Sequence, residues 1–209
     1  MAMPVPPRLI LATRNAHKTA EIRAMLGDRF EVLDVTALPD CPQIDETGTT
    51  FLANARLKAL GISRLTDGWV LSDDSGLEVD ALGGAPGVWS SSFGGEEGNH
   101  ALNNARLQAA MAGQTERRAR FRCTMVLACR GREEANFSGT VEGRIIDSPR
   151  GLHGFGYDPL FIPDGYEQTF AELGENVKNS LSHRARALSQ VIDFLAGVRK
   201  SFTSINEFA

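Results

Sequence analysis

The chain has 209 residues, of which 42% are hydrophobic and 23% charged, and its formal net charge is −4. This length and balance are typical of one globular domain, or of two closely joined lobes, and give no sign of disorder. The negative net charge argues against a broad basic surface for polymeric nucleic acid or for an anionic membrane. The sequence contains no run of 18 apolar residues, so we expect no transmembrane helix.

The cysteines and the chain ends predict a reduced, single-domain protein. Cys41, Cys123 and Cys129 form no CxxC pair and no zinc pattern, which favours reduced thiols and a cytoplasmic location. Residues 1–7 contain three prolines and no basic segment followed by an apolar core, so we predict a loose tail. Residues 8–200 are expected to form one domain, and residues 201–209 a C-terminal tail.

Short apolar runs and helical patterns alternate along the first half of the chain. Strands are predicted at residues 9–12, 32–35 and 69–71. A helix that stops at Gly27 follows the first strand, and a second helix begins near Thr50. The third strand is predicted to end in an acidic turn at residues 72–76, because Asp, Ser and Gly are common turn residues.

The second half contains the clearest strand pattern. A helix over residues 99–111 comes first, and its inner face is expected to carry Leu102, Ala105, Ala109 and Ala112. Apolar and polar side chains then alternate over residues 118–129 and again over 137–145, which predicts a long hairpin. A glycine-rich loop precedes a last long helix that begins near Ser182. Interleaved strands and helices indicate an α/β fold.

Three acidic residues could hold a divalent cation. Asp73 and Asp74 follow a buried strand, where negative charge is costly unless it is compensated. Mg²⁺ is usually held by one or two carboxylates together with substrate phosphates. Glu46, just before the second helix, offers a third carboxylate. Each observation has a plain alternative, since a solvated turn explains the aspartates and the helix dipole favours an acid at position 46.

Two helix starts could meet a phosphate group. The segment from Thr13 to Lys18 follows a strand and opens a helix, where backbone amides bind phosphate and a lysine adds charge. It lacks the glycine pattern of a Walker A loop. Asn54 and Lys58 share a helical face that could direct a cation at a phosphate, although a solvated face explains this pair equally well.

The last polar cluster is typical of a base-binding pocket. Aromatic side chains between the glycines of residues 154–158 suit stacking on a base, with Asp158 as an acceptor. Lys178, His183 and Arg184 are expected before or at a helix start, where positive charge opposes the helix dipole. This position favours ligand binding by the lysine and the arginine, whereas a single histidine is more often a structural hydrogen-bonding residue.

Together these motifs resemble the inosine/xanthosine triphosphate pyrophosphatase family, whose members remove deaminated purine nucleotides from the precursor pool. The matching motifs follow in family order from about residue 8 to about residue 195. They are residues 11–18 with Glu21, 46–51, 54–55 with 58–59, 73–80, 84–88, 154–159 and 182–185.

The resemblance implies an elongated α/β fold of two lobes, with a central mixed sheet flanked by helices, a cleft between the lobes, and a homodimer. It implies Mg²⁺-dependent hydrolysis of ITP, dITP or XTP to the monophosphate and pyrophosphate. By position, Asp74 matches the general base, and Glu46, Asp73 and Asp74 match the metal ligands. The implied triphosphate contacts are Thr13, Arg14, Asn15, Ala16, His17, Lys18, Lys58 and Ser75. The implied base and nucleotide contacts are Phe155, Gly156, Tyr157, Asp158, Lys178, His183 and Arg184.

Three positions depart from the family pattern, and two rival functions stay open. Ala53 stands where an acid is frequent, Ser92 where an arginine is common, and His153 where a glycine is frequent. None of them coincides with the implied metal or phosphate residues, so activity is expected. The rivals are a related pyrophosphatase for modified pyrimidine nucleotides and a nucleotide-binding or structural dimer without catalysis. The 182–184 motif and the spacing of Asn15 and Lys18 favour the purine group.

Overall fold

A six-stranded sheet forms the centre of the computed structural model, which describes the backbone of residues 6–206 and the side chains of residues 6–197. The strands are β1 (Arg8–Leu11), β2 (Glu31–Asp34), β3 (Trp69–Val79), β4 (Arg118–Cys129), β5 (Arg132–Ile145) and β6 (Phe161–Pro163). The helices are α1 (Ala16–Leu26), α2 (Phe51–Ser63), α3 (His100–Met111), α4 (Phe170–Leu181) and α5 (His183–Asn206).

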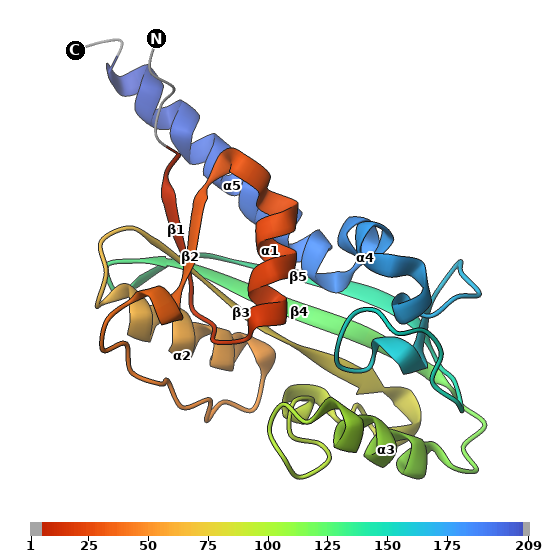
Figure 1. The fold of residues 1–209 in the computed structure, drawn as a ribbon. Helices are drawn as coiled ribbons and strands as arrows, with labels where there is room; N and C mark the ends of the chain where they lie inside the picture. Colours follow the sequence, from red (N-terminus) through yellow and green to blue (C-terminus); the bar gives the residue numbers. More distant parts are fainter. Residues whose placement is uncertain (1–5, 207–209) are drawn as a thin grey trace.

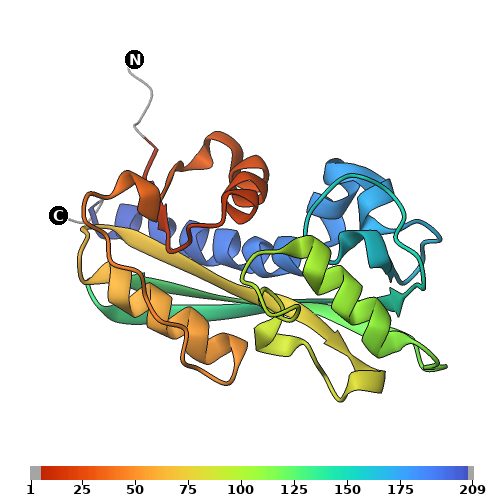
Figure 2. The same cartoon turned by 60° about the horizontal axis from the view of Figure 1, so that its bottom comes forward.

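The sheet is mixed, and its long strands join two lobes. Its strand order is β2-β1-β3-β4-β5-β6, with β1 parallel to β2 and β3, and with antiparallel pairing from β3 through β6. The strands β3, β4 and β5 extend from the lobe that contains β1, β2, α1 and α2 into the lobe that contains α3, α4 and β6 (Figures 1 and 2). The expected two-lobed α/β fold with a central mixed sheet is therefore confirmed.

The alternating pattern of β4 explains how helices cover both faces of the sheet. Cys123, Met125 and Leu127 pack with side chains of α1 and α5 on one face. Val126 and Ala128 pack with Ala55 and Ala59 of α2 on the opposite face. Because successive side chains of a strand point to opposite faces, each parity of β4 meets its own helix layer. The predicted hairpin and the predicted apolar pattern are confirmed.

The inner face predicted for α3 is wrong. Leu102 is 43% exposed, whereas Leu107 and Met111 are buried in the core of the second lobe. Asn103 is also buried, because its side chain accepts a hydrogen bond from the Gly94 amide at 2.6 Å and donates one to the Ser91 carbonyl at 2.9 Å. The larger apolar side chains and the buried amide decide which face turns inward, and the alanines have too little apolar surface to compete.

The helix α4 was not predicted, and it changes the position of Lys178. Thr169 and Glu172 form a capping box at its start, a sequence signal that is visible in retrospect. Lys178 lies in the last turn of α4, ahead of the start of α5 at His183, so the expectation that its charge opposes a helix dipole is wrong. At that end of a helix, positive charge is favoured by the helix dipole.

The chain ends differ in part from the expected tails. The helix α5 continues to Asn206, so residues 201–206 of the expected C-terminal tail are helical. Residues 1–5 and 207–209 lie outside the described residues. Within residues 6–206, none of the helices combines the length and the apolar character that crossing a membrane requires.

Candidate active site

The acidic segment at residues 72–76 is the middle of a strand, so the prediction of a turn is wrong. β3 pairs with β4 without interruption, including Asp73 with Met125 and Asp74 with Thr124. Glycine is required at position 76 by close packing and not by a turn. A Cβ atom at this position would lie 2.4 Å from both the Gly87 carbonyl oxygen and the Ser90 hydroxyl. Since neighbouring side chains of a strand point to opposite faces, the two aspartates are separated by the sheet itself.

Asp73 is buried on the face of β3 that meets α1 and α5. Lys18 lies 2.7 Å from its Oδ1 atom, and the Arg184 Nε atom lies 2.9 Å from its Oδ2 atom. The Ser75 hydroxyl and the Cys123 thiol donate hydrogen bonds to the same carboxylate, at 2.9 and 3.1 Å. Burial raises the pKa of Asp73, but Arg184 and then Lys18 outweigh burial and hold this pKa well below its usual value. Both carboxylate oxygens are thus occupied.

Asp74 lies on the other face, with Lys58 and Glu46. The Lys58 Nζ atom is 2.6 Å from Glu46 Oε2 and 3.2 Å from Asp74 Oδ1, and it donates a hydrogen bond to the Asp73 carbonyl at 3.0 Å. The Asp74 Oδ2 atom is buried and has no hydrogen-bond partner among the described residues. Burial raises the pKa of Asp74 to about 6, against the opposing effect of Lys58.

The three acids that the sequence suggested as a metal cluster are therefore not brought together. Glu46 and Asp74 share Lys58, whereas Asp73 belongs to the opposite side of the strand. Within residues 6–197, no group of three or more His, Cys, Asp or Glu side chains is placed to hold a metal ion. The structure offers a two-carboxylate site.

The loop that carries Glu46 is held by Asn54. The Asn54 side chain is buried and accepts a hydrogen bond from the Gly48 amide at 2.7 Å. A Cβ atom at Gly48 would lie 2.6 Å from this amide oxygen, so the close approach requires glycine. Asn54 thus fixes the acidic loop, while Lys58, one turn further along α2, reaches the carboxylates.

The start of α1 is capped internally. The Asn15 side chain accepts hydrogen bonds from the amides of His17 and Lys18, at 3.0 and 3.1 Å, so these two amides already have a partner. The Thr13 hydroxyl accepts from the Asn15 amide. Arg14 donates to the Cys41 carbonyl at 2.6 Å, which ties α1 to the acidic loop. The cap therefore orients Lys18 toward β3.

A second buried ion cluster lies where α1, α4 and α5 meet. Lys178 is 2.5 Å from Asp158 and 2.8 Å from Glu21, and Arg184 is 2.5 Å from the same glutamate. The Asp158 carboxylate also accepts from the Phe155 amide at 2.9 Å, which shapes the loop after Gly154. Burial raises the pKa of Asp158, and Lys178 opposes this shift. Glu21 therefore connects the two cations.

His183 begins α5 and faces a ring of β4. Its imidazole stacks on Phe121, with ring centroids 4.9 Å apart and planes at 12°. Burial, followed by the charges of Arg184 and Lys178, holds the pKa of His183 well below its usual value, so the imidazole is neutral. Its Nδ1 atom is buried and has no hydrogen-bond partner among the described residues. This atom is available to a ligand.

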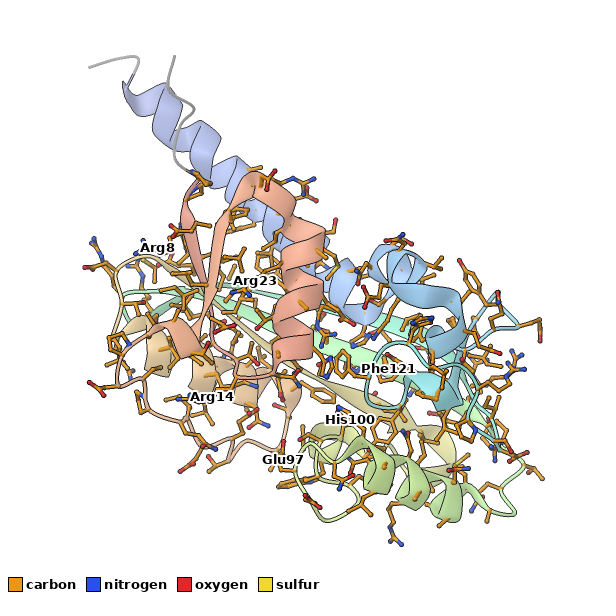
Figure 3. The ribbon with its side chains drawn as sticks, in the orientation of Figure 1. Arg8, Arg14, Arg23, Glu97, His100 and Phe121 are labelled. Carbon is orange, nitrogen blue, oxygen red and sulfur yellow. The ribbon has the colours of Figure 1, made fainter. Side chains whose placement is uncertain are left out.

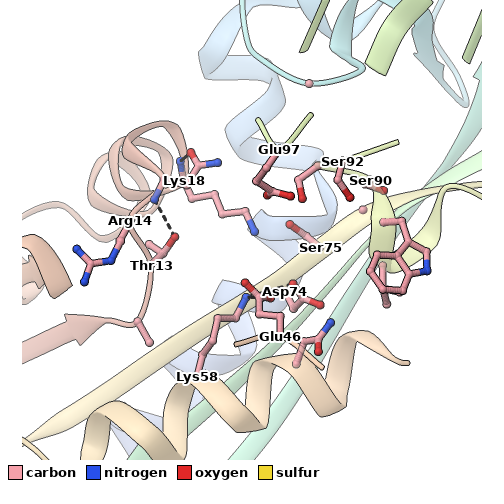
Figure 4. Close-up of a pocket in the computed structure, with 18 of the residues that line it drawn as sticks. Thr13, Arg14, Lys18, Glu46, Lys58, Asp74, Ser75, Ser90, Ser92 and Glu97 are labelled. Carbon is pink, nitrogen blue, oxygen red and sulfur yellow. Dashed lines mark hydrogen bonds and ion pairs between the residues drawn. The ribbon is translucent and has the colours of Figure 1, made fainter. Parts of the chain in front are cut away.

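These groups border one cleft of about 580 Å³ (Figure 4). Its basic lining residues are Arg14, Lys18, Lys58, Lys178 and Arg184, and its acidic lining residues are Asp45, Glu46, Asp74, Glu97 and Asp158. Lys18, Lys58, Asp74 and Ser75 approach the cleft from the lobe of β1 and β2, and Ser90, Ser92 and Glu97 approach it from the other side (Figure 4). Of the residues that the sequence suggested as ligand contacts, Ala16, His17 and Asp73 do not line it.

Several residues of this site were not predicted from the sequence. Glu21 appeared only as part of a motif, yet it joins the cations of α4 and α5. Phe121 and His100 line the cleft, as does Glu97 (Figure 3). Glu21 lies three residues after Lys18 on α1, a spacing that places both on one helical face and could have indicated it. The other three lie outside the motif residues that the sequence argument placed in the site.

Comparisons with known proteins find one matching family, similar sequences and similar solved structures. Residues 9–194 match the model of the Ham1 family. The chain is 47% identical to a dITP/XTP pyrophosphatase of Exiguobacterium sp., with 91% of this chain and 100% of the relative covered. Among solved structures, a HAM1 protein from Coxiella burnetii has a TM-score of 0.83 at 37% identity, covering 91% of this chain and 99% of that chain. A nucleoside-triphosphatase / dITP/XTP pyrophosphatase from Mycobacterium abscessus has a TM-score of 0.72 at 38% identity, covering 88% and 98%.

Proposed function

Because the chain belongs to the Ham1 family, we propose that it is a nucleoside-triphosphate pyrophosphatase that hydrolyses dITP, XTP and ITP to the monophosphate and pyrophosphate. The observation that carries this proposal is the polar centre of the cleft. There Lys58 joins Glu46 and Asp74, and Lys18 lies on the other face of the same strand. Such a centre suits a polyanionic substrate, because lysines compensate its charge beside carboxylates that can act on water.

We further propose that the reaction depends on Mg²⁺. The residues present fit this ion, because Asp74 Oδ2 is a buried oxygen without a partner and the Glu46 carboxylate shares Lys58 with it. Two carboxylates together with substrate phosphates form a usual set of Mg²⁺ ligands. Glu46 and Asp74 would hold the ion, which would offset phosphate charge and make a bound water easier to deprotonate.

The side chains of the site have separate roles in this proposal. Asp74 accepts the proton of the attacking water while the bond between the α and β phosphates breaks. Lys58 and Lys18 stabilise the charge that develops on the phosphates. Asp73 and Glu21 act as positioning residues, because they hold Lys18 and the buried Arg184 in place.

The purine base would bind at the end of the cleft away from Lys58 and Asp74, and its contacts there would determine which substrate is preferred. Lys178, His183 and Arg184 line this part together with Phe155. Lys178 is a donor that suits a 6-keto oxygen, and an amino group at the same place would meet another donor. A site that leaves such groups unpaired discriminates strongly between the two bases.

The test is pyrophosphate release from dITP, XTP, ITP, GTP and ATP, with Mg²⁺ and with a chelator. We expect release from the three deaminated nucleotides in Mg²⁺, weak release from GTP and ATP, and no release after chelation. Equal rates for ATP and ITP would remove the proposed selectivity. Activity that persists after chelation would contradict the metal, and turnover confined to modified pyrimidine nucleotides would favour the rival pyrophosphatase.

We also propose that the enzyme is a homodimer, as the family resemblance implies, and that it is cytoplasmic, as its cysteine pattern favours. Light scattering on the purified chain tests the assembly state directly. A monomer that has full activity would contradict the dimer.

A further inference from the structure

Three aromatic rings from three separate elements meet beside the base loop. The His17 imidazole at the start of α1 stacks on the Phe155 ring, with centroids 5.1 Å apart and planes at 13°. The imidazole of His100, the first residue of α3, lies 6.0 Å from Phe155 and 6.1 Å from His17. His100 lines the cleft, whereas His17 lines a neighbouring cavity of about 90 Å³. Neither imidazole forms a hydrogen bond or an ion pair with another described residue.

Four of the five basic side chains that line the cleft are already paired with carboxylates, and the fifth, Arg14, donates to the Cys41 carbonyl. The lining of the cleft carries equal numbers of basic and acidic side chains. Lys18, Lys58, Lys178 and Arg184 each lie within ion-pair distance of a carboxylate. A nucleoside triphosphate brings about four negative charges, and one divalent cation offsets about two of them. The cation and Arg14, which forms no ion pair with a described residue, together offset about three of these charges, so the bound state favours about one further positive charge.

We infer that His100 is a nucleotide-binding residue whose imidazole is neutral in the free enzyme and takes up one proton from solvent when the polyphosphate enters the cleft. This inference rests on the proposed pyrophosphatase function. In the free enzyme a neutral imidazole packs against the apolar ring of Phe155. In the complex the imidazolium shares the cleft with the polyphosphate, whose negative charge favours the charged form. No covalent bond changes in this step, because one proton moves from a buffer acid to a ring nitrogen.

The groups around His100 are consistent with this change. Burial and then the neighbouring His17 lower the pKa of His100 in the free protein, while Asp158 opposes them. Protonation in the free state would also add a third positive charge to those of Lys178 on α4 and Arg184 on α5. A bound anion favours the protonated form of His100 instead of the neutral one. The charged or titratable groups that border the same region are His17, Lys18, Glu21, Asp158, Glu175, Lys178 and Arg184, with Glu97 in the loop before α3.

Binding of the α,β-methylene analogue of ITP tests the inference without turnover. Calorimetry in two buffers of different ionisation enthalpy gives the number of protons taken up, in Mg²⁺ and between about pH 6.5 and about pH 8.5. The variants are His100→Asn, which stays neutral, and His100→Lys, which stays charged. His153→Asn is the matched control, because His153 is exposed and does not line the cleft.

We expect wild type and His153→Asn to take up more protons than His100→Asn. At about pH 6.5 the His100→Asn variant should bind the analogue about 3–10-fold more weakly than wild type, and the two should converge near pH 8.5. At that higher pH, His100→Lys should bind about 3–10-fold more tightly than His100→Asn. Ring-nitrogen NMR of the wild-type protein, which has four histidines, should show one ring becoming protonated on binding. His100→Asn assigns this signal.

Two results would overturn the inference. One is equal proton uptake by wild type and His100→Asn, and the other is a His100→Lys variant that binds no more tightly than His100→Asn at about pH 8.5. If the proposed pyrophosphatase function is wrong, the result is different from these two: wild type releases no pyrophosphate from ITP, dITP or XTP. Equal proton uptake in an enzyme that does release pyrophosphate removes the role of His100 alone.

Discussion

The two faces of β3 carry the same residue type in very different surroundings. Asp73 is bound on one face by Lys18, Arg184, Ser75 and Cys123, so both of its oxygens are occupied. Asp74, the next residue, has one oxygen near Lys58 and one buried oxygen without a partner among the described residues. The pKa of Asp73 is held well below its usual value, whereas burial raises the pKa of Asp74 to about 6.

This difference separates a structural carboxylate from a reactive one. A carboxylate with every oxygen paired stabilises the cations around it and is poorly placed to accept another ligand. A buried carboxylate with a free oxygen costs stability, and that cost is typical of a group that meets a metal ion, a proton or a substrate. The position of a side chain along the strand decides between these roles, because consecutive residues face opposite layers.

Replacing the reactive carboxylate should give the largest effect. In Asp74→Asn we expect kcat/KM for ITP to fall by about 10²–10⁴-fold, because a proton acceptor is lost. The free energy of unfolding without metal should not fall, since a buried charge disappears while Lys58 keeps Glu46. Pyrophosphate release and urea unfolding measure the two quantities. An active variant would remove Asp74 from catalysis, and an unfolded variant would contradict the division of roles.

Replacing the structural carboxylate should act mainly on stability. In Asp73→Asn the fully buried Arg184 loses its charged partner on β3, so we expect the free energy of unfolding to fall by about 3 kcal/mol. Urea unfolding checks this value. Glu133→Gln is the matched control, because Glu133 pairs with Arg56 at 2.7 Å on the surface and should cost less than about 1 kcal/mol. Equal losses in the two variants would show that Asp73 has no special structural role.

The pH dependence of stability should show the same contrast with a smaller effect. The folded protein holds the Asp74 proton more tightly than the unfolded chain does, because burial raises this pKa to about 6. Lowering the pH through 6 therefore favours the folded state, by about 1 kcal/mol between pH 7 and pH 5. Asp73 has the opposite sign, since its stabilisation is lost only as pH falls through its lowered pKa. Metal-free urea unfolding of wild type and Asp74→Asn should differ by the Asp74 contribution. Parallel curves would contradict the assignment.

The hairpin and the helix starts could be predicted from the sequence because their patterns involve residues close together along the chain. The alternation in β4 and β5 predicted a hairpin, and the structure confirms it. The polar residues Asn15 and Thr50 lie at the starts of α1 and α2 and cap them. The helix α4 was not predicted, although Thr169 and Glu172 form a capping box at its start, and Gly174 interrupts its helical backbone.

Two of the wrong predictions, the turn at residues 72–76 and the inner face of α3, have the same physical cause. Asp-Asp-Ser-Gly is typical of a turn when it is isolated, but here pairing with β4 keeps it extended. The buried face of α3 is determined by the packing of Leu107 and Met111 and by the hydrogen bonds of Asn103. The periodicity of apolar residues within the helix did not indicate these contacts. In both places tertiary contacts outweigh the local preference.

The sequence by itself determined the fold class, the family resemblance and most of the residues that border the cleft. Only the tertiary structure decided that Asp73 and Asp74 act on opposite faces, that Glu21 joins the cations of α4 and α5, and that His100 meets His17 and Phe155. These contacts join residues far apart along the chain, such as Arg184 and Glu21 at a separation of 163 residues. Local patterns report which way a side chain points within its own element, whereas the partner on another element depends on how the lobes pack.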